Sequence, residues 1–162
     1  MGALRDYLAR DHSHCDALMR RAAKCVARRD WAAAQPAIVA FQGAMESHLL
    51  LEESVLFPAF EVALGRADSP TRAMRAEHLR IRAVVGRLTD SVSERDADAF
   101  ATHGEVLLLA LHQHTEKEEG VLYPMIERVL GHRCSVVLAA MQASGNVTQC
   151  SPEQVTVFDA VT

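Results

Sequence analysis

Three features of the sequence predict an all-α fold, an up-down-up-down antiparallel four-helix bundle with a short C-terminal helical extension. Alanine, leucine, glutamate and arginine are abundant and aromatic residues are few, a composition that favours helices. Apolar residues recur at helical spacing near the N-terminus, at Leu4, Leu8, Cys15, Leu18, Ala22 and Val26. A pattern of polar and turn residues also occurs twice, which indicates two copies of a helical hairpin.

The repeat has a constant offset of 66 residues without a gap. The matched residues are mostly polar or turn-forming, so they are more than the apolar pattern that any two helices share. The pairs are His12/His78, Asp30/Asp96, His48/His114, Glu52/Glu118, Glu53/Glu119, Pro58/Pro124 and Gly65/Gly131. We therefore expect a duplicated bundle domain over residues 1–131 and an extension over residues 132–162.

Capping and breaking residues delimit the four helices. Asp30 and Asp96 are suited to cap the second and fourth helices, and Gly65 and Gly131 to end them. Pro58 is expected to bend the end of the second helix, because proline removes one backbone hydrogen bond. The helices are predicted over about residues 4–28, 31–64, 70–93 and 97–130.

The tail beyond the repeat has a weaker pattern. A short fifth helix is predicted over residues 133–143, ended by the breaker stretch that begins at Ser144-Gly145. Two further helix starts are expected, with Ser69 capping the third helix and Ser151-Pro152 beginning one more turn. The tail is expected to cover one side of the bundle or to mediate homodimer contacts.

Four histidines are predicted to lie at one level of the bundle. In an antiparallel hairpin, residues equally distant from the turn have the same height, and residue 30 is the midpoint of His12 and His48. Residue 96 is likewise the midpoint of His78 and His114, and each histidine lies roughly 27 Å from its turn at about 1.5 Å per residue. The midpoint of His48 and His78 falls near the Gly65 turn, so the two hairpins match as well.

Two glutamates join this level, each four residues after a histidine and therefore on the same helix face. The six predicted metal ligands are His12, His48, Glu52, His78, His114 and Glu118. Six such groups in an apolar core are very costly unless a cation neutralises them. A single core histidine is usually just hydrogen-bonded, but two copies with level-matched partners favour a metal site over a purely structural role.

The neighbouring polar residues receive other assignments. Glu53 and Glu119 point about 100° away from the ligand face, so they either face solvent or support a histidine. Four histidines without a partner in the repeat are expected on the surface or in packing: His14, His103, His112 and His132. The cysteines, Cys15, Cys25, Cys134 and Cys150, contain no Cys-x-x-Cys pair and are expected to be reduced thiols.

Nitrogen and carboxylate ligands without thiolate suit iron, with manganese or zinc as substitutes. The twofold pattern favours two ions, each with two histidines, bridged by both glutamates and by an oxo or hydroxo group. Of about twelve positions on two six-coordinate ions, this set fills about ten. One position per ion would remain for O2, NO, peroxide or water.

The motifs resemble the hemerythrin-like, His-His-Glu cation-binding domain over about residues 3–131. The motifs are Asp11-His12, His48-Leu-Leu-Leu-Glu52-Glu53, Glu77-His78 and His114-Thr-Glu-Lys-Glu118-Glu119, and each long motif continues to an aromatic residue and proline. The resemblance implies a four-helix bundle with a non-haem di-iron centre.

The ligand set also bears on the subtype. Oxygen-carrying hemerythrins have a fifth histidine four residues from another on the third helix, where this chain has Met74 and Arg82. Four histidines and two glutamates are more similar to the di-iron proteins that repair iron-sulfur clusters. We expect reaction with or binding of O2, NO or peroxide in stress response or iron handling. The alternative is an iron- or oxygen-sensing module that acts through a protein partner, and enzymatic activity stays open.

Bulk properties exclude other classes. A net charge of −4 without a Lys/Arg run argues against nucleic-acid binding. The charged N-terminal stretch does not resemble a signal peptide, and apolar runs such as residues 106–111 are too short to cross a bilayer. The expectation is a cytoplasmic protein without membrane contact.

Overall fold

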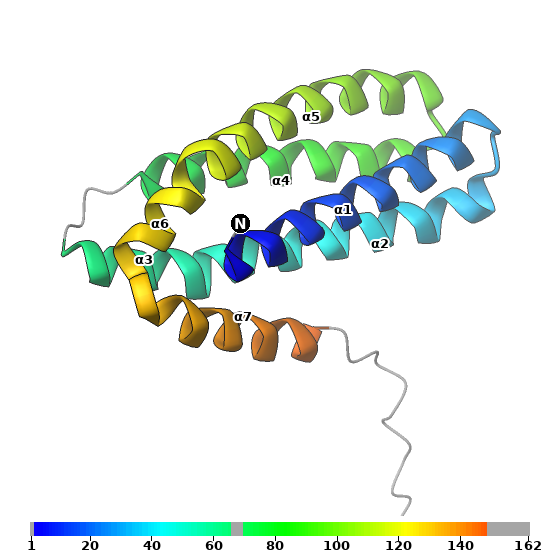
Figure 1. Cartoon of the computed structure of the whole chain (residues 1–162). Coiled ribbons are helices and arrows are strands. Elements are labelled where there is room, and N and C mark those ends of the chain that lie inside the picture. Colours follow the sequence, from blue (N-terminus) through cyan, green and yellow to red (C-terminus); the bar gives the residue numbers. More distant parts are fainter. Residues whose placement is uncertain (1, 66–69, 149–162) are drawn as a thin grey trace, which may run out of the picture.

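The computed structural model describes residues 2–65 and 70–148, and this part of the chain is helical (Figure 1). The first half contains α1 (Ala3–Ala27), α2 (Trp31–Leu51), the π-helical segment η1 (Glu52–Leu56) and α3 (Phe57–Leu64). The second half contains α4 (Thr71–Ser93), α5 (Ala97–Lys117), the π-helical segment η2 (Glu118–Leu122) and α6 (Tyr123–Leu130). A 3-10 turn, η3 (Gly131–Arg133), leads to α7 (Cys134–Thr148). The all-α four-helix bundle with a helical extension is confirmed.

The element bounds repeat at the 66-residue offset. α5, η2 and α6 begin and end 66 residues after α2, η1 and α3. The tight turns also correspond, because Arg29 and Arg95 both adopt positive φ, at 57° and 58°. The side chain of Asp30 then accepts a hydrogen bond from Ala33 N, and that of Asp96 accepts from two backbone N–H groups. Both predicted caps are therefore confirmed.

The predicted helices 31–64 and 97–130 are each interrupted by a π turn. In each case the π turn begins at Glu52 or Glu118 and ends one residue before an aromatic-proline pair. Phe57 N donates to Glu52 O, five residues back, and Tyr123 N donates in the same way to Glu118 O. Since the proline that follows cannot donate a hydrogen bond and crowds the carbonyl four residues before it, a widened turn accommodates it. Sequence periodicity predicted a proline effect here but not this register change.

The extension packs against the bundle, as Figure 1 shows for α7. Val137 and Met141 are buried, and α7 contacts α1, α2 and η1. The predicted break at Ser144-Gly145 is wrong, because α7 continues through both residues to Thr148. A Cβ at Gly145 would lie 3.2 Å from the Tyr7 hydroxyl, so the glycine permits close packing of α7 instead of ending it. The predicted cap at Ser69 and the predicted turn at 151–152 lie outside the described residues.

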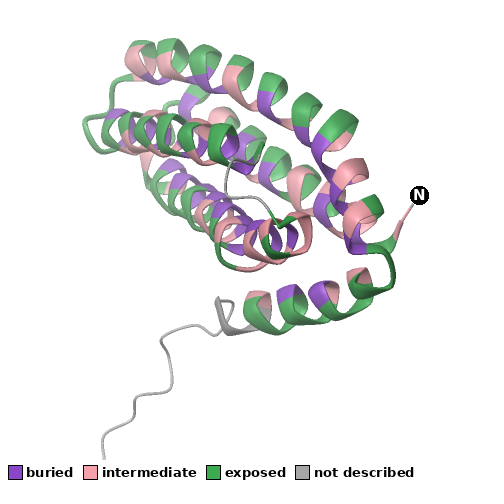
Figure 2. Cartoon of the chain, turned by 90° about the vertical axis from the view of Figure 1, so that its left-hand side faces the viewer, coloured by how far each residue is buried: buried purple, intermediate pink, exposed green. Residues whose placement is uncertain are grey.

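Buried residues line the inner helix faces in two apolar clusters (Figure 2). The first, between the hairpin turns and the middle of the bundle, includes Phe41, Ile38 and Leu88. The second, at the opposite end, includes Phe57 and Phe60. The buried polar residues His48, Glu52, His78, His114 and Glu118 occur between these clusters in the sequence of each helix. This polar layer is the feature that requires explanation.

Asp96→Ala is expected to lower the free energy of unfolding by about 1 kcal/mol, because two N–H groups at the start of α5 lose their acceptor. Equilibrium urea denaturation measures the change. Glu105→Ala, at an exposed position within α5, is the control and should alter stability by less than about 0.5 kcal/mol. Equal effects of the two substitutions would contradict the capping assignment.

Candidate metal centre

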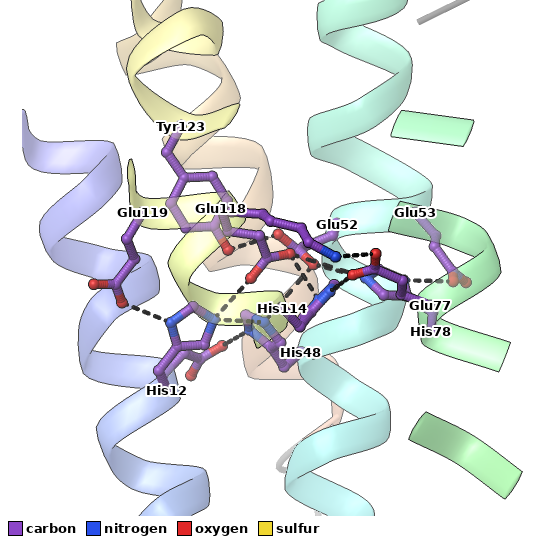
Figure 3. Close-up of polar contacts among 12 residues, drawn as sticks. His12, His48, Glu52, Glu53, Glu77, His78, His114, Glu118, Glu119 and Tyr123 are labelled. Atoms are coloured by element: carbon purple, nitrogen blue, oxygen red, sulfur yellow. Dashed lines mark hydrogen bonds and ion pairs between the residues drawn. The ribbon is translucent and has the colours of Figure 1, made fainter. Parts of the chain in front are cut away.

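Four helical segments contribute the six predicted ligands, and their side chains converge in the bundle interior (Figure 3). His12 comes from α1, and His48 and Glu52 come from the junction of α2 with η1. His78 comes from α4, and the junction of α5 with η2 supplies the remaining two, His114 and Glu118. The sequence prediction that these residues share one level therefore agrees with their positions.

Donor atoms lie at distances suited to shared coordination. Nitrogen and oxygen atoms of Glu52, His78, His114 and Glu118 all lie within 4.8 Å of one another. The same holds for a second group, His12, His48 and Glu118, which shares the last glutamate with the first. Nε2 atoms of His12 and His48 are only 3.1 Å apart. The arrangement could hold one cation in each group.

Several of these atoms are buried without a hydrogen bond of acceptable geometry to any described residue. They are Glu52 Oε2, His78 Nε2, His114 Nε2, and both carboxylate oxygens of Glu118. The His114 Nε2 to Glu118 Oε1 distance is 2.9 Å, but the angles do not suit a hydrogen bond. Buried polar atoms are nearly always satisfied in proteins. Five unsatisfied atoms of metal-binding type at one point therefore fit a cation bound among them.

A carboxylate lies at the Nδ1 atom of each of the four histidines. Glu53 lies 2.7 Å from His78 Nδ1 and Glu119 2.8 Å from His12 Nδ1, which confirms the histidine-supporting interpretation of these two acids. Two further carboxylates do the same: Asp11 is 3.3 Å from His48 Nδ1, and Glu77 is 2.9 Å from His114 Nδ1. An Nδ1–H donated to the carboxylate leaves Nε2 free to bind a cation.

Sequence reasoning assigned no such role to Asp11 and Glu77. Both precede a ligand histidine directly and differ by the 66-residue offset, which is the signal that could have identified them. Each carboxylate contacts a histidine on the neighbouring helix and not the histidine that follows it in sequence. Their position in the sequence therefore did not indicate which histidine they support.

Tyr123 is a further site residue that sequence reasoning missed. It is fully buried, and its hydroxyl donates to Glu52 Oε1 at 2.7 Å. Its ring stacks on that of His12 with centroids 6.1 Å apart. Burial raises the pKa of Tyr123 well above its usual range, and the negative charge of Glu52 adds to the effect, so the hydroxyl keeps its proton.

Charges within the layer compensate one another in the cation-free protein. Burial favours neutral imidazole, but contacts with the glutamates outweigh it and raise the pKa of both His12 and His78 to about 9. Burial also favours the protonated form of Glu118, but contacts with His114, His12 and His78 hold its pKa well below the usual range. Protonated histidines thus balance the negative charge of the glutamates when no cation is bound.

The other histidines and the described cysteines belong to neither donor group, although Cys15 borders the same cavity as His12 and His48. His14, His112 and His132 are exposed and His103 is half-buried, as predicted. Cys15, Cys25 and Cys134 are free, and Cys15 is buried on α1; Cys150 lies outside the described residues. The cluster of donors therefore contains nitrogen and oxygen and no thiolate.

Residues 3–126 match the family model described as the hemerythrin HHE cation binding domain. The chain belongs to this family. In the corresponding comparisons, no curated protein and no solved structure matches the chain. Membership of the hemerythrin HHE family and the buried His/Glu cluster together show a cation-binding protein.

The hemerythrin HHE match ends within α6 and covers the four-helix bundle, so α7 lies beyond it. Among the described residues, no helix combines the length and apolar character that a membrane span requires.

The metal-free protein is expected to lose stability as pH rises from 6.5 through 9. A folded-state pKa of about 9 against 6.5 in the unfolded chain stabilises the fold below pH 6.5, and this contribution disappears as His12 and His78 lose their protons. The expected loss is roughly 2 kcal/mol or more, since one pKa unit corresponds to about 1.4 kcal/mol. Thermal melting in the presence of a chelator measures it.

A variant carrying His12→Gln and His78→Gln is the comparison for this measurement. Its stability should depend much less on pH over the same interval, because neither glutamine titrates. A flat profile in the unaltered chain would contradict the assigned protonation states.

Proposed function

We propose that this chain is a non-haem di-iron protein that binds or reacts with O2, NO or peroxide. The observation that carries the proposal is the set of five buried, unsatisfied donor atoms at the centre of a family-typical bundle. The proposed ligands are His12, His48, Glu52, His78, His114 and Glu118. Nitrogen and oxygen donors suit iron, and manganese or zinc could substitute.

The donor residues fall into two groups, which supports two cations per chain. Each of the two donor groups contains a pair of histidines from adjacent helices, and Glu118 belongs to both. The oxygens of Glu118 also face different histidines, since Oε1 lies 2.9 Å from His114 Nε2 and Oε2 lies 3.3 Å from His12 Nε2. Glu118 would therefore be a ligand common to both ions.

The surrounding residues would control access and orientation. The four Nδ1 carboxylates fix the ring orientations, and the apolar clusters on both sides of the layer keep bulk water away. A cavity of about 20 Å³ borders His12, His48 and His114, which is room for about one water-sized molecule. When bound, a di-iron centre supplies the electrons for reduction or reversible binding of such a ligand.

The proposal assigns this function to residues 1–131, with residues 132–162 as an extension of the bundle. A role in nitrosative or oxidative stress, or in iron handling, is consistent with a small-molecule ligand. A cytoplasmic location belongs to the same proposal.

Anaerobic reconstitution is expected to load about two iron ions per chain. His114→Ala should remove much of this iron, because the imidazole of His114 is one of the four buried donors and also lines the cavity. His112→Ala is a matched control on the same helix, since His112 is 70% exposed and pairs only with Glu116 among the described residues. Metal analysis after desalting measures both. Unchanged iron in the first variant would refute the ligand assignment.

Exposure of the reduced, iron-loaded protein to O2 or NO is expected to produce a ligand-dependent charge-transfer absorption band. An anaerobic spectrum before and after each gas tests this expectation. A stable band indicates reversible binding, whereas rapid conversion to the oxidised spectrum indicates a redox reaction. Identical spectra before and after both gases would contradict the proposed reactivity.

A further inference from the structure

Tyr123 breaks the twofold pattern of the centre. Its counterpart at the 66-residue offset is Phe57, which is equally buried. Each ring stacks on a ligand histidine, Tyr123 on His12 and Phe57 on His78 at a centroid distance of 5.7 Å. Only Tyr123 carries a hydroxyl, which donates to Glu52 Oε1 at 2.7 Å. The phenylalanine offers no such group to Glu118.

This hydroxyl makes the two glutamates unequal as donors. Both oxygens of Glu118 are free of hydrogen bonds among the described residues and face different histidines. Glu52 has only Oε2 free, which lies 3.3 Å from His78 Nε2 and 3.7 Å from His48 Nε2. The donors accordingly form one group of four around His78 and His114 and one of three around His12 and His48.

The outer carboxylates show the same inequality. Arg82 contacts both oxygens of Glu53, at 2.8 and 3.0 Å, and Lys117 contacts Glu77, so the acids behind His78 and His114 are each held by a cation. The offset counterparts of these two cations are Asp16 and Leu51. Within the described residues, no lysine or arginine forms an ion pair with the acids behind His12 and His48, namely Glu119 and Asp11.

Exposure and access differ in the same direction. The His78 side chain is fully buried, whereas that of His12 is 14% exposed. The cavity of about 20 Å³ borders both His12 and His48 but only His114 of the other pair, because His78 is not among its lining residues. His78 is thus enclosed, whereas both histidines of the His12–His48 half border the cavity.

We propose that the two halves bind cations unequally, with Tyr123 as the positioning residue that sets the difference. The His78–His114 half retains its cation, and the His12–His48 half exchanges its cation and receives the incoming small ligand. More donors and fixed histidine orientation favour retention in the first half. The positive charges of Arg82 and Lys117 oppose binding there, but Glu53 and Glu77 offset them. This inference rests on the proposed function, because it requires two cations on the assigned ligands.

Stepwise cation titration of the metal-free chain tests the inequality. Anaerobic Co²⁺ is the probe, followed by calorimetry and by the visible bands that report its coordination. The first ion is expected to bind at least about tenfold more tightly than the second, in line with the effect of supporting contacts on metal affinity. Repulsion between two ions could also weaken the second step, so the order of filling must be established.

Two histidine variants identify which half fills first. His12→Ala should keep the tight step and bind one ion, whereas His78→Ala should lose the tight step and bind its ion at least about tenfold more weakly. Circular dichroism establishes that each variant is folded. If both variants bind one ion with the same affinity, the halves are equal and the inference is wrong.

Tyr123→Phe copies the residue found in the other half of the repeat. It frees Glu52 Oε1 and removes a hydrogen bond that supports a ligand of the tighter group, so the ratio of the two affinities should fall by about tenfold or more. Tyr7→Phe, at a half-buried tyrosine on α1, is the control and should alter neither step. An unchanged ratio of the two affinities in Tyr123→Phe would overturn the role of Tyr123.

These measurements also separate the two proposals. A chain that binds no Co²⁺ and no iron removes the proposed function together with the inference. A chain that binds two ions with indistinguishable half-sites removes only the inference and leaves the di-iron function standing.

Discussion

Six donor side chains, five of them buried and His12 14% exposed, lie between two apolar clusters, and this is the constraint on which the rest of the structure depends. Removing imidazoles and carboxylates from water is costly unless charge and hydrogen-bonding capacity are compensated. Four carboxylates on the Nδ1 atoms compensate the histidines from outside the layer. Within the layer, protons on histidines and the hydroxyl of Tyr123 compensate the glutamates. The donor atoms in this layer therefore favour a positive charge among them. A cation can contact several of these donors at once, whereas each proton serves one or two. The apolar clusters on either side serve the same end, because they exclude the water that would otherwise compete for these donors.

The π turns connect this chemistry to the backbone. Each begins at a ligand glutamate and ends before an aromatic-proline pair, so the extra residue per turn falls between the donors and the second apolar cluster. Phe57 and Tyr123 lie directly after these turns and stack on ligand histidines. The prolines thus contribute to the site indirectly, since the register change they require brings an aromatic ring against it. This arrangement is consistent with the frequent occurrence of π turns at functional sites.

Much of the fold and of the site's location could be predicted, because the repeat supplies geometry that a single hairpin does not. Equal spacing of His12 and His48 from Asp30 placed the histidines at one height without any knowledge of packing. The π turns escaped prediction because apolar periodicity hardly distinguishes a five-residue from a four-residue hydrogen-bond step. The helix through Gly145 escaped it because a glycine that permits close packing looks the same in sequence as one that ends a helix. The role of Tyr123 was not predicted for a related reason. Both copies of the repeat have an aromatic residue before proline, and only the hydroxyl of Tyr123, which Phe57 lacks, gives it a role in the site.

The departures from the repeat are as informative as the repeat itself. A duplicated hairpin would by default give two equivalent cation positions, and reaction with a small ligand does not need two equivalent positions. In the proposed centre, one firmly held ion would fix the shape of the site, while a second ion with fewer donors would keep coordination available for the ligand. Tyr123 in place of phenylalanine and Arg82 in place of an acid are both departures in the second copy of the repeat, and they contact Glu52 and Glu53 of the first copy. Under the proposal, these few departures in one copy would give the centre one half that retains its ion and one half that receives the ligand.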